Sequence, residues 1–224
     1  MIEQILPAEV ASAEAFDDAA PAGLFPEEEA AVARAVAKRR SEFATGRACA
    51  RAALARLGLP PAPIVPGERG APRWPAGVAG SITHCAGYRA AAVARVGDVV
   101  SLGLDAEPND VLPEGVLDHI SLEQERAGLA GLGAAGPGVC WDRLLFCAKE
   151  SVYKAWFPLT GRWLGFEQAV ITFEPGAGTF AADLLEPGPV LDGRPLTRFT
   201  GRWLARDGLL LAAIAVPARP RPDA

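Results

Sequence analysis

Gly103-Leu104-Asp105-Ala106-Glu107 follows the apolar run Val99-Val100-Ser101-Leu102, which predicts a buried strand that ends at Pro108. Side chains alternate along a strand, so Asp105 and Glu107 fall on one face. Two carboxylates one pleat apart suit Mg²⁺, which takes a few carboxylates and leaves its other positions to water and phosphates. The stretch therefore predicts either a metal-binding strand end or an ordinary acidic one, and the rest of the chain decides between them.

Length and composition set the broad class. A chain of 224 residues can bury a core as one domain or as two fused half-domains without disulfides or a structural metal. The four cysteines form no C-x-x-C pair, and no basic, apolar leader opens the chain. No apolar run approaches the length of a membrane span. We therefore expect a cytoplasmic protein with reduced thiols and no membrane partner.

The distribution of charge narrows the choice of ligand. A net charge of −5 argues against unspecific nucleic-acid binding, which needs a basic surface to displace counterions from phosphates. Six arginines nevertheless cluster between residues 34 and 56. Guanidinium groups grip phosphates in a bidentate fashion. The cluster predicts either a solvated helix face or a local phosphate site.

The first half of the chain reads as helices followed by strands. Residues 1–24 are expected to form an edge segment or a loose arm. Helices are predicted over 26–38 and 39–57, and a hairpin tip over 68–70. Three short runs, 78–83, 90–96 and 99–104, are typical of an antiparallel meander.

The second half repeats that order. Two short helices are predicted within 113–132, with Ser121 as the N-cap of the second, and a long one over 141–157, stopped by Pro158. Strands are predicted over 169–173, 179–185, 199–204 and 209–216. This indicates an α+β fold of two similar halves, residues 1–100 and 101–216, followed by a disordered tail, 217–224.

Two further features could belong to a site. Glu150 and Lys154 share a helix face, while Lys149 points elsewhere, which is compatible with a surface ion pair or with catalysis. His84 ends the strand that begins at 78, where it could be structural or could donate to a phosphate.

Taken in order, these motifs resemble the 4′-phosphopantetheinyl transferases, and more narrowly the enterobactin-synthetase type of the surfactin-like group. The resemblance covers about residues 25–175. Its parts are Arg39-Arg40-x-x-Phe43-x-x-x-Arg47, Gly80-Ser81-Ile82-Thr83-His84, Gly103-x-Asp105-x-Glu107 and Phe146-Cys147-Ala148-Lys149-Glu150-Ser151-Val152-Tyr153-Lys154. The pairing of G-x-D-x-E with A-K-E-S-x-Y-K is its most specific element.

The resemblance implies a monomer with pseudo-two-fold symmetry and coenzyme A in the cleft between the halves. Such an enzyme moves the phosphopantetheine arm onto a serine of an acyl or peptidyl carrier protein and releases adenosine 3′,5′-bisphosphate. The carriers would serve polyketide, nonribosomal-peptide or fatty-acid synthesis. The metal would be Mg²⁺ or Mn²⁺.

The resemblance also implies roles for residues. Asp105, Glu107 and Glu150, with the carbonyl of Ala106, match the metal ligands, and Glu150 and Lys154 match the catalytic pair. Arg39 and Arg47 match the basic residues at the 3′-phosphate of the coenzyme. Some relatives place a lysine near the position of Pro66, so Arg69 would have to take over its contacts here. The set implied to bind the coenzyme is Arg39, Arg47, Arg69, Thr83, His84, Asp105, Glu150 and Lys154.

The chemistry of the residues fits this role. Attack of a serine hydroxyl on a pyrophosphate needs negative charge to be neutralised, which a carboxylate-held cation and a lysine can do. Glu150 could accept the serine proton, directly or through water. Three alternatives stay open: a Mg²⁺-dependent phosphohydrolase that uses the same acids and lysine with water as the nucleophile, a coenzyme-binding scaffold without chemistry, and an enzyme with a nucleophile at Ser81 or at Cys85 beside His84. The arginine-bearing helix and the second half favour the transferase over a simple hydrolase.

Overall fold

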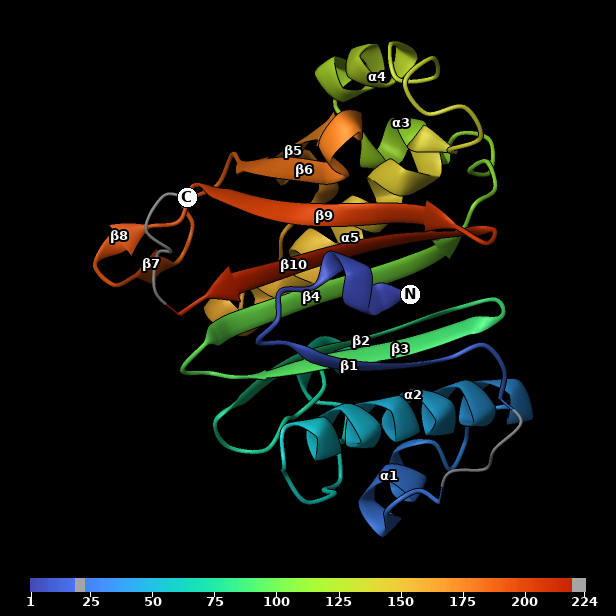
Figure 1. Cartoon of the computed structure of the whole chain (residues 1–224), viewed down its shortest axis with the longest axis vertical. Coiled ribbons are helices and arrows are strands. Elements are labelled where there is room, and N and C mark those ends of the chain that lie inside the picture. The colour runs from blue at the N-terminus through green and yellow to red at the C-terminus, as the bar shows by residue number, and fades with distance from the viewer. Residues whose placement is uncertain (19–22, 219–224) are drawn as a thin grey trace.

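The computed structural model describes residues 1–18 and 23–218 and contains two main antiparallel sheets, each covered by one long helix (Figure 1). The helices are α1 Pro26–Ala31, α2 Ala37–Arg56, α3 Val116–Ile120, α4 Glu123–Ala130 and α5 Trp141–Thr160. The strands are β1 Ala11–Ala15, β2 Val78–Cys85, β3 Tyr88–Arg95, β4 Val99–Pro108, β5 Ala169–Glu174, β6 Thr179–Leu184, β7 Val190–Leu191, β8 Arg194–Pro195, β9 Arg198–Arg206 and β10 Leu209–Pro217. The predicted α+β class with two similar halves is confirmed.

The first sheet has the order β1-β3-β2. Its central strand β3 is rich in alanine because both of its faces are covered. Ala91 and Val93 pack with residues of α2, whereas Ala90 and Ala92 face the strands of the other half. Small side chains allow these two contacts to be made at close range. The first sheet is thus held between α2 and the second sheet.

The second sheet has the order β4-β10-β9-β6-β5. Strand β10 alternates between its two faces, as expected for a strand buried on both sides. Leu210, Ala212 and Ile214 pack in the core beneath α5, and Leu209 and Leu211 pack toward the first sheet. The core beneath α5 and the core at the first sheet therefore lie on the two faces of β10.

The predicted meander is wrong in its last step. Strands β2 and β3 pair as expected, but β4 pairs with β10 and leaves the first sheet. In β10, Leu211 lies opposite Ala106 and Ala213 opposite Leu104, in a core that also includes Tyr88. This pairing buries apolar residues separated by more than a hundred positions in sequence, which a local pattern cannot reveal.

Three helix boundaries also differ from the prediction. Helix α1 stops at Ala31, where buried Val32 leaves the helical conformation, and buried Glu28 in its first turn pairs with Arg51 of α2. Ser121 does not cap α4: the N-cap is Leu122, whose N–H donates to the Glu125 carboxylate at 2.8 Å. Pro158 lies inside the last turn of α5, where it removes only one backbone hydrogen bond, and the helix ends before Gly161.

The N-terminal residues pack where the two halves meet. The first residues form a short 3-10 turn, Ile2–Ile5, whose isoleucines pack in the core shared with β4 and β10. β1 is the edge strand foreseen for the N-terminal segment. The boundary near residue 100 stays a prediction, and of the predicted tail residues 219–224 lie outside the described part of the chain.

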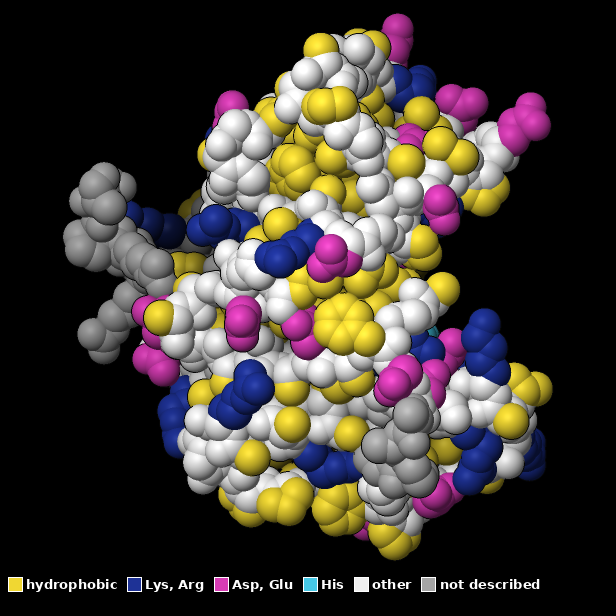
Figure 2. Space-filling view, turned by 45° about the vertical axis from the view of Figure 1, so that its right-hand side comes forward, with side chains coloured by type: hydrophobic (Ala, Val, Ile, Leu, Met, Phe, Trp, Pro, Cys, Tyr) yellow, Lys and Arg dark blue, Asp and Glu magenta, His cyan; other side chains and the backbone are white. Residues whose placement is uncertain are grey.

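No helix among residues 1–18 and 23–218 is both long and apolar enough to cross a membrane. All four cysteines are free. Seen from the side, the surface is hollowed between the two halves (Figure 2). Acidic and basic side chains lie along this recess.

Candidate active site

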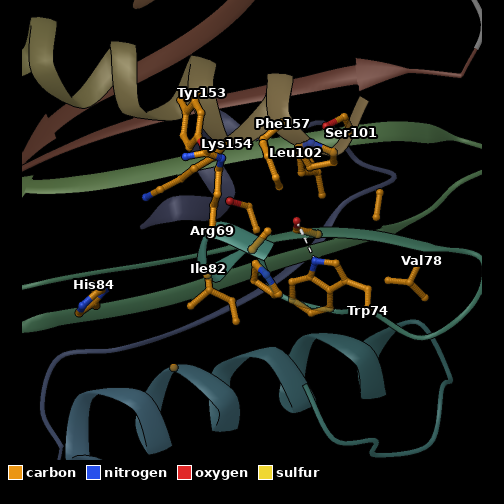
Figure 3. A pocket seen from close by; sticks show the side chains of 18 of the residues that line it. Arg69, Trp74, Val78, Ile82, His84, Ser101, Leu102, Tyr153, Lys154 and Phe157 are labelled. Atoms are coloured by element: carbon orange, nitrogen blue, oxygen red, sulfur yellow. Dashed lines mark hydrogen bonds between the residues drawn. The ribbon is translucent and has the colours of Figure 1, made fainter. Parts of the chain in front are cut away.

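A cavity of about 560 Å³ lies between α2, β2, β4 and α5 (Figure 3). The figure shows Tyr153, Lys154 and Phe157 entering it from α5, with Ile82 and His84 on the opposite strand. The ionisable side chains that line it are Arg39, Glu42, Arg47, Arg69, His84, Glu150, Tyr153 and Lys154. Four cationic groups face two carboxylates, so the cavity suits an anionic ligand.

Helix α2 carries two of these cations, and they differ in burial. Arg39 is exposed, and its Nη1 donates to Nε2 of His84 at 2.5 Å. Arg47 is only 7% exposed, stacks on the ring of Phe43 and donates from Nε to the carbonyl of Ile64 at 3.0 Å. Burial lowers the pKa of Arg47 to about 10, although the charge of Glu28 opposes that shift. Arg47 therefore supports the cavity wall as well as lining it.

His84 must accept the proton offered by Arg39, so its Nε2 is unprotonated. Burial lowers the pKa of His84, and the charge of Arg39 lowers it further. Thr83, one residue earlier, points the other way along the strand: it is buried, does not line the cavity, and its hydroxyl lies 3.4 Å from Oδ1 of Asp105. His84 therefore faces the cavity, and Thr83 faces Asp105 on β4.

Arg69 lies at the tip of the loop between α2 and β2. Its φ of 50° is in the left-handed region, and its guanidinium lies 5.4 Å from the ring of Trp163. Pro66 and Pro72 pair across the base of this loop. The loop therefore directs the basic side chain of Arg69 into the cavity. This is the same loop in which the family resemblance implies a lysine near Pro66.

The acids on β4 lie next to the cavity and are linked to it by Lys154. Nζ of Lys154 binds Oδ1 of Asp105 at 2.6 Å, and this charge raises the pKa of the lysine although burial alone would lower it. Oδ2 of Asp105 is buried and has no hydrogen-bond partner among the described residues. A buried carboxylate oxygen without a partner is costly unless a cation or water meets it.

Glu107 shares its face of β4 with Asp105, as the strand period predicts, and binds Nη1 of Arg143 at 3.2 Å. Burial, followed by the charge of Asp105, raises the pKa of Glu107 to about 7. Glu150 is half-buried and lines the cavity. Its carboxylate makes no ion pair or hydrogen bond with the described residues. Burial and Asp105 also raise the pKa of Glu150, against the opposing charge of Lys154.

These acids do not form a ready ligand set. Among the described residues, no three His, Cys, Asp or Glu side chains converge as a metal site. Lys154 and Arg143 hold Asp105 and Glu107 instead. The donors nevertheless fit a hard cation, because the group holds three carboxyls, two of them with raised pKa values, and one orphaned buried oxygen.

Close contact between β4 and α5 sets the position of these groups. Gly103 is required there, because a Cβ at this position would overlap the carbonyl oxygen of Ser151. Ser101 Oγ donates to the carbonyl of Ala155 at 2.7 Å, and Ser81 Oγ accepts from the N–H of Leu104 at 3.0 Å. The strand is thereby tied to the helix on one side and to β2 on the other.

The nucleophile alternatives have no support. Ser81 is buried, and its oxygen bonds the backbone of β4. Burial, together with Glu107 and Asp105, raises the pKa of Cys85 to about 12, so its thiol stays protonated and unreactive.

Sequence reasoning missed Arg143 and Glu42. Arg143 lies seven residues before Glu150 on α5, a spacing of about two turns that places both on one face, and this spacing could have indicated it. Glu42 lies 3.7 Å from Arg39 and 3.6 Å from Arg89. Nothing in its local sequence distinguished it from the other acids of the first half.

Two family models match the chain. That of the 4′-phosphopantetheinyl transferase N-terminal domain covers residues 27–94, and that of the 4′-phosphopantetheinyl transferase superfamily covers residues 101–202. Asp105, Glu107, Glu150 and Lys154 all fall within the second match.

Curated proteins match over most of the chain. It is 61% identical over 221 residues to the 4′-phosphopantetheinyl transferase Svp of Streptomyces mobaraensis, covering 97% of this chain and 90% of that protein. It is 54% identical over 226 residues to the 4′-phosphopantetheinyl transferase PptT of Mycobacterium tuberculosis, covering 96% and 98%. A shorter match, 34% over 137 residues, relates it to enterobactin synthase component D of Salmonella typhi, with 60% of this chain and 55% of that protein covered.

Proposed function

The chain belongs to the 4′-phosphopantetheinyl transferase superfamily, and from this we propose how its own residues bind coenzyme A and transfer its arm. The enzyme is a 4′-phosphopantetheinyl transferase that activates carrier proteins. The resemblance inferred from the motifs is confirmed, and the hydrolase and scaffold alternatives are set aside. The residue assignments, the metal and the docking surface that follow are proposals.

Coenzyme A occupies the cavity between the two halves. The observation that carries this assignment is the position of Lys154, which lines the cavity while its Nζ binds Asp105 of the acid strand. The cationic cavity and the carboxylates thus form one site. Lys154 would meet the pyrophosphate, with His84 and Arg69 on the other walls donating to the remaining phosphate oxygens.

The metal-binding residues are Asp105 and Glu107, with Glu150 and the carbonyl of Ala106 completing the set. The orphaned Oδ2 of Asp105 is the oxygen most in need of a cation. A bound Mg²⁺ or Mn²⁺ would neutralise charge on the pyrophosphate.

In the transfer step, the serine oxygen of the carrier forms a bond to the phosphorus on the pantetheine side of the pyrophosphate. The bond from that phosphorus to the bridging oxygen breaks, and adenosine 3′,5′-bisphosphate leaves with the bond's electron pair. Glu150 accepts the serine proton, directly or through water, with the carboxylate oxygen that the cation would leave unbound, and burial raises its pKa as suits a base. Lys154 stabilises charge on the leaving phosphate.

The test is incubation of an apo carrier protein with coenzyme A and Mg²⁺, read by intact mass. The variants Asp105→Asn, Glu107→Gln, Glu150→Gln and Lys154→Met should each fold and lose turnover by about a hundredfold or more. Glu174→Gln, at an exposed position on β5 outside the cavity lining, is the matched control. Near-normal turnover of Asp105→Asn at ordinary Mg²⁺ would remove that residue from the site.

The 3′-phosphate is placed at the α2 end of the cavity. Arg39 is the exposed contact there, and Arg47 reaches the same wall while also bonding Ile64. Arg39→Ala should weaken coenzyme A binding roughly tenfold to a hundredfold and leave dephospho-coenzyme A almost unaffected, as measured by calorimetry. Equal losses for both ligands would place Arg39 at the pyrophosphate instead. Arg34→Ala, on an exposed residue outside the cavity lining, is the control.

The carrier protein docks beside the acid strand, on the segment 111–132. Val111 is 72% exposed, and Val116 is half-buried. Leu117 packs against the core of the second half and is a weaker candidate. An acidic enzyme gains little from net attraction to an acidic carrier, so a local apolar contact must supply the recognition. Val111→Asp should raise the KM for the carrier while the KM for coenzyme A stays unchanged.

A further inference from the structure

Arg143 joins the acid strand to the loop 109–112, and all three of its side-chain nitrogens take part. Nη1 donates to Oε2 of Glu107 at 3.2 Å, Nε donates to the carbonyl of Asp110 at 3.1 Å, and Nη2 donates to the carbonyl of Val111 at 2.9 Å. The side chains of Arg143 and Glu107 are each 18% exposed, so the pair is well shielded from solvent. One guanidinium therefore contacts both a proposed metal ligand and the proposed docking segment.

The loop 109–112 has further contacts near the start of α5. Asn109 donates to the carbonyl of Gly138 at 2.7 Å and accepts from the N–H of Cys140 at 2.9 Å. The N–H of Leu112 donates to Asp142 at 2.9 Å. These bonds fix the backbone of the loop and leave the side chain of Val111 facing solvent.

The charge on Arg143 has a second consequence. Within the described residues, Glu107 has no other ion-pair partner, so the guanidinium is its counter-cation. A divalent cation on Glu107 would share the carboxylate with this positive group and be repelled by it. Arg143 and the cation therefore compete for Glu107.

We propose that Arg143 is a positioning residue with two opposed effects: its charge weakens metal binding at Glu107, and its bonds to the 110 and 111 carbonyls hold the loop on which the carrier protein docks. The inference rests on the proposed metal site and docking segment. Removing a residue needed only for folding would weaken both metal binding and carrier binding. Removing Arg143 should instead tighten metal binding and weaken carrier binding.

The first measurement is Mn²⁺ binding to the full-length protein by calorimetry, without coenzyme A. Arg143→Gln removes the charge and should tighten Mn²⁺ binding by about threefold to tenfold. In transfer assays at saturating metal, the same variant should raise the KM for the carrier by about fivefold or more, with a smaller change in kcat.

Two matched variants separate charge from loop geometry. Arg143→Lys keeps the positive charge but loses the fork, so Mn²⁺ affinity should stay near that of the wild type while the KM for the carrier rises. Asn109→Ala removes two loop bonds without changing any charge, and it should likewise raise only the KM. Melting temperatures of all variants check that they fold.

The outcomes distinguish this inference from the proposals beneath it. Unchanged or weaker Mn²⁺ binding by folded Arg143→Gln overturns the competition, provided that Asp105→Asn has lost binding. If the wild type and Asp105→Asn bind Mn²⁺ alike, the metal site itself is wrong and the inference falls with it. An unchanged carrier KM in Arg143→Lys and Asn109→Ala overturns the role of the loop.

Discussion

Gly103 determines how closely the acid strand approaches α5. A methyl group at this position would overlap the carbonyl oxygen of Ser151, a backbone atom that cannot turn aside. Gly103→Ala should therefore push strand and helix apart, lower the free energy of unfolding by about 1–3 kcal/mol and reduce transfer by moving Asp105 relative to Glu150. Urea denaturation and the mass assay measure the two effects.

Gly97→Ala is the matched control for this change. An added methyl group there meets nothing within 4 Å, so stability should shift by no more than a few tenths of a kcal/mol. If Gly103→Ala proved as stable and as active as Gly97→Ala, close packing of β4 on α5 would not be what positions the acids.

His84 provides a readout of the charge in the cavity. Burial lowers its pKa in the free protein, and Arg39 contributes to the same shift. A phosphate beside the ring would stabilise the protonated form, so coenzyme A should raise the pKa of His84. Removing the positive neighbour with Arg39→Ala should raise it as well. Proton NMR of the histidine rings follows both changes.

Only two histidines occur in the chain, which makes that experiment simple to assign. His84→Asn identifies the resonance, and His119 on α3 serves as the internal reference. A pKa of His84 that does not respond to coenzyme A would mean that the ring lies away from the phosphates, although it lines the cavity.

At the scale of elements, α5 carries charged side chains for separate tasks. Glu150 and Lys154 line the cavity, and Arg143 reaches the loop 109–112. Lys149 turns to another side, as its helix position predicts, and binds Glu125 of α4 at 2.8 Å. Both partners of this pair are almost fully buried.

The Glu125–Lys149 pair fixes α4 and β5 to α5. Lys149 also donates to the carbonyls of Phe166 and Ala169, and Glu125 accepts from the N–H of Ile171. Glu125→Ala would leave a buried ammonium without its counter-charge and should cost about 3–5 kcal/mol of stability. Thermal and urea unfolding measure this loss.

Glu123→Ala tests whether that cost is specific. Glu123 lies in the same first turn of α4 but is exposed, so its loss should cost about 1 kcal/mol at most. Adding Lys149→Met to Glu125→Ala removes the stranded charge and should recover part of the stability. Equal costs for Glu123→Ala and Glu125→Ala would mean that the buried pair is energetically neutral.

The elements differ in how far the sequence could predict them. Helix α5 and strands β5, β6, β9 and β10 follow from periodicity, because each buries a regular face of its own residues. The pairing of the strands could not be predicted in this way. Strand β4 looks like the third strand of a meander, but it pairs with β10, about a hundred residues later, where Leu211 and Ala213 lie opposite its apolar residues.

In the candidate site, too, local spacing could be predicted but contacts between distant elements could not. The spacing in G-x-D-x-E correctly places Asp105 and Glu107 on one face, since alternation is local. The sequence could not indicate that Lys154 and Arg143 would occupy these acids, because those contacts depend on how α5 crosses β4. Nor could it distinguish exposed Arg39 from buried Arg47, which the loop around Ile64 covers.

At the scale of the molecule, the two halves share a core. Tyr88 and Ala92 of the first sheet pack in one cluster with Leu104 and Leu211 of the second, and Ile2 joins them. Ser81 adds a hydrogen bond from β2 to β4. The cavity lies along the same junction, so binding and folding depend on one interface.

This shared core predicts that neither half folds alone. The first half in isolation would expose the face of β3 that carries Tyr88, Ala90 and Ala92, all of them fully buried in the whole chain. The second would lose the cover over Leu104 and Leu211. The whole protein should then unfold in one cooperative transition by calorimetry, and coenzyme A should raise the midpoint of that single transition. Fragments 1–97 and 98–224, expressed separately, should lack dispersed amide signals in NMR spectra and regain them when mixed. Two resolved transitions, or a well-dispersed spectrum from either fragment alone, would show that the family's two modules are independent units and that the cavity merely forms where they touch.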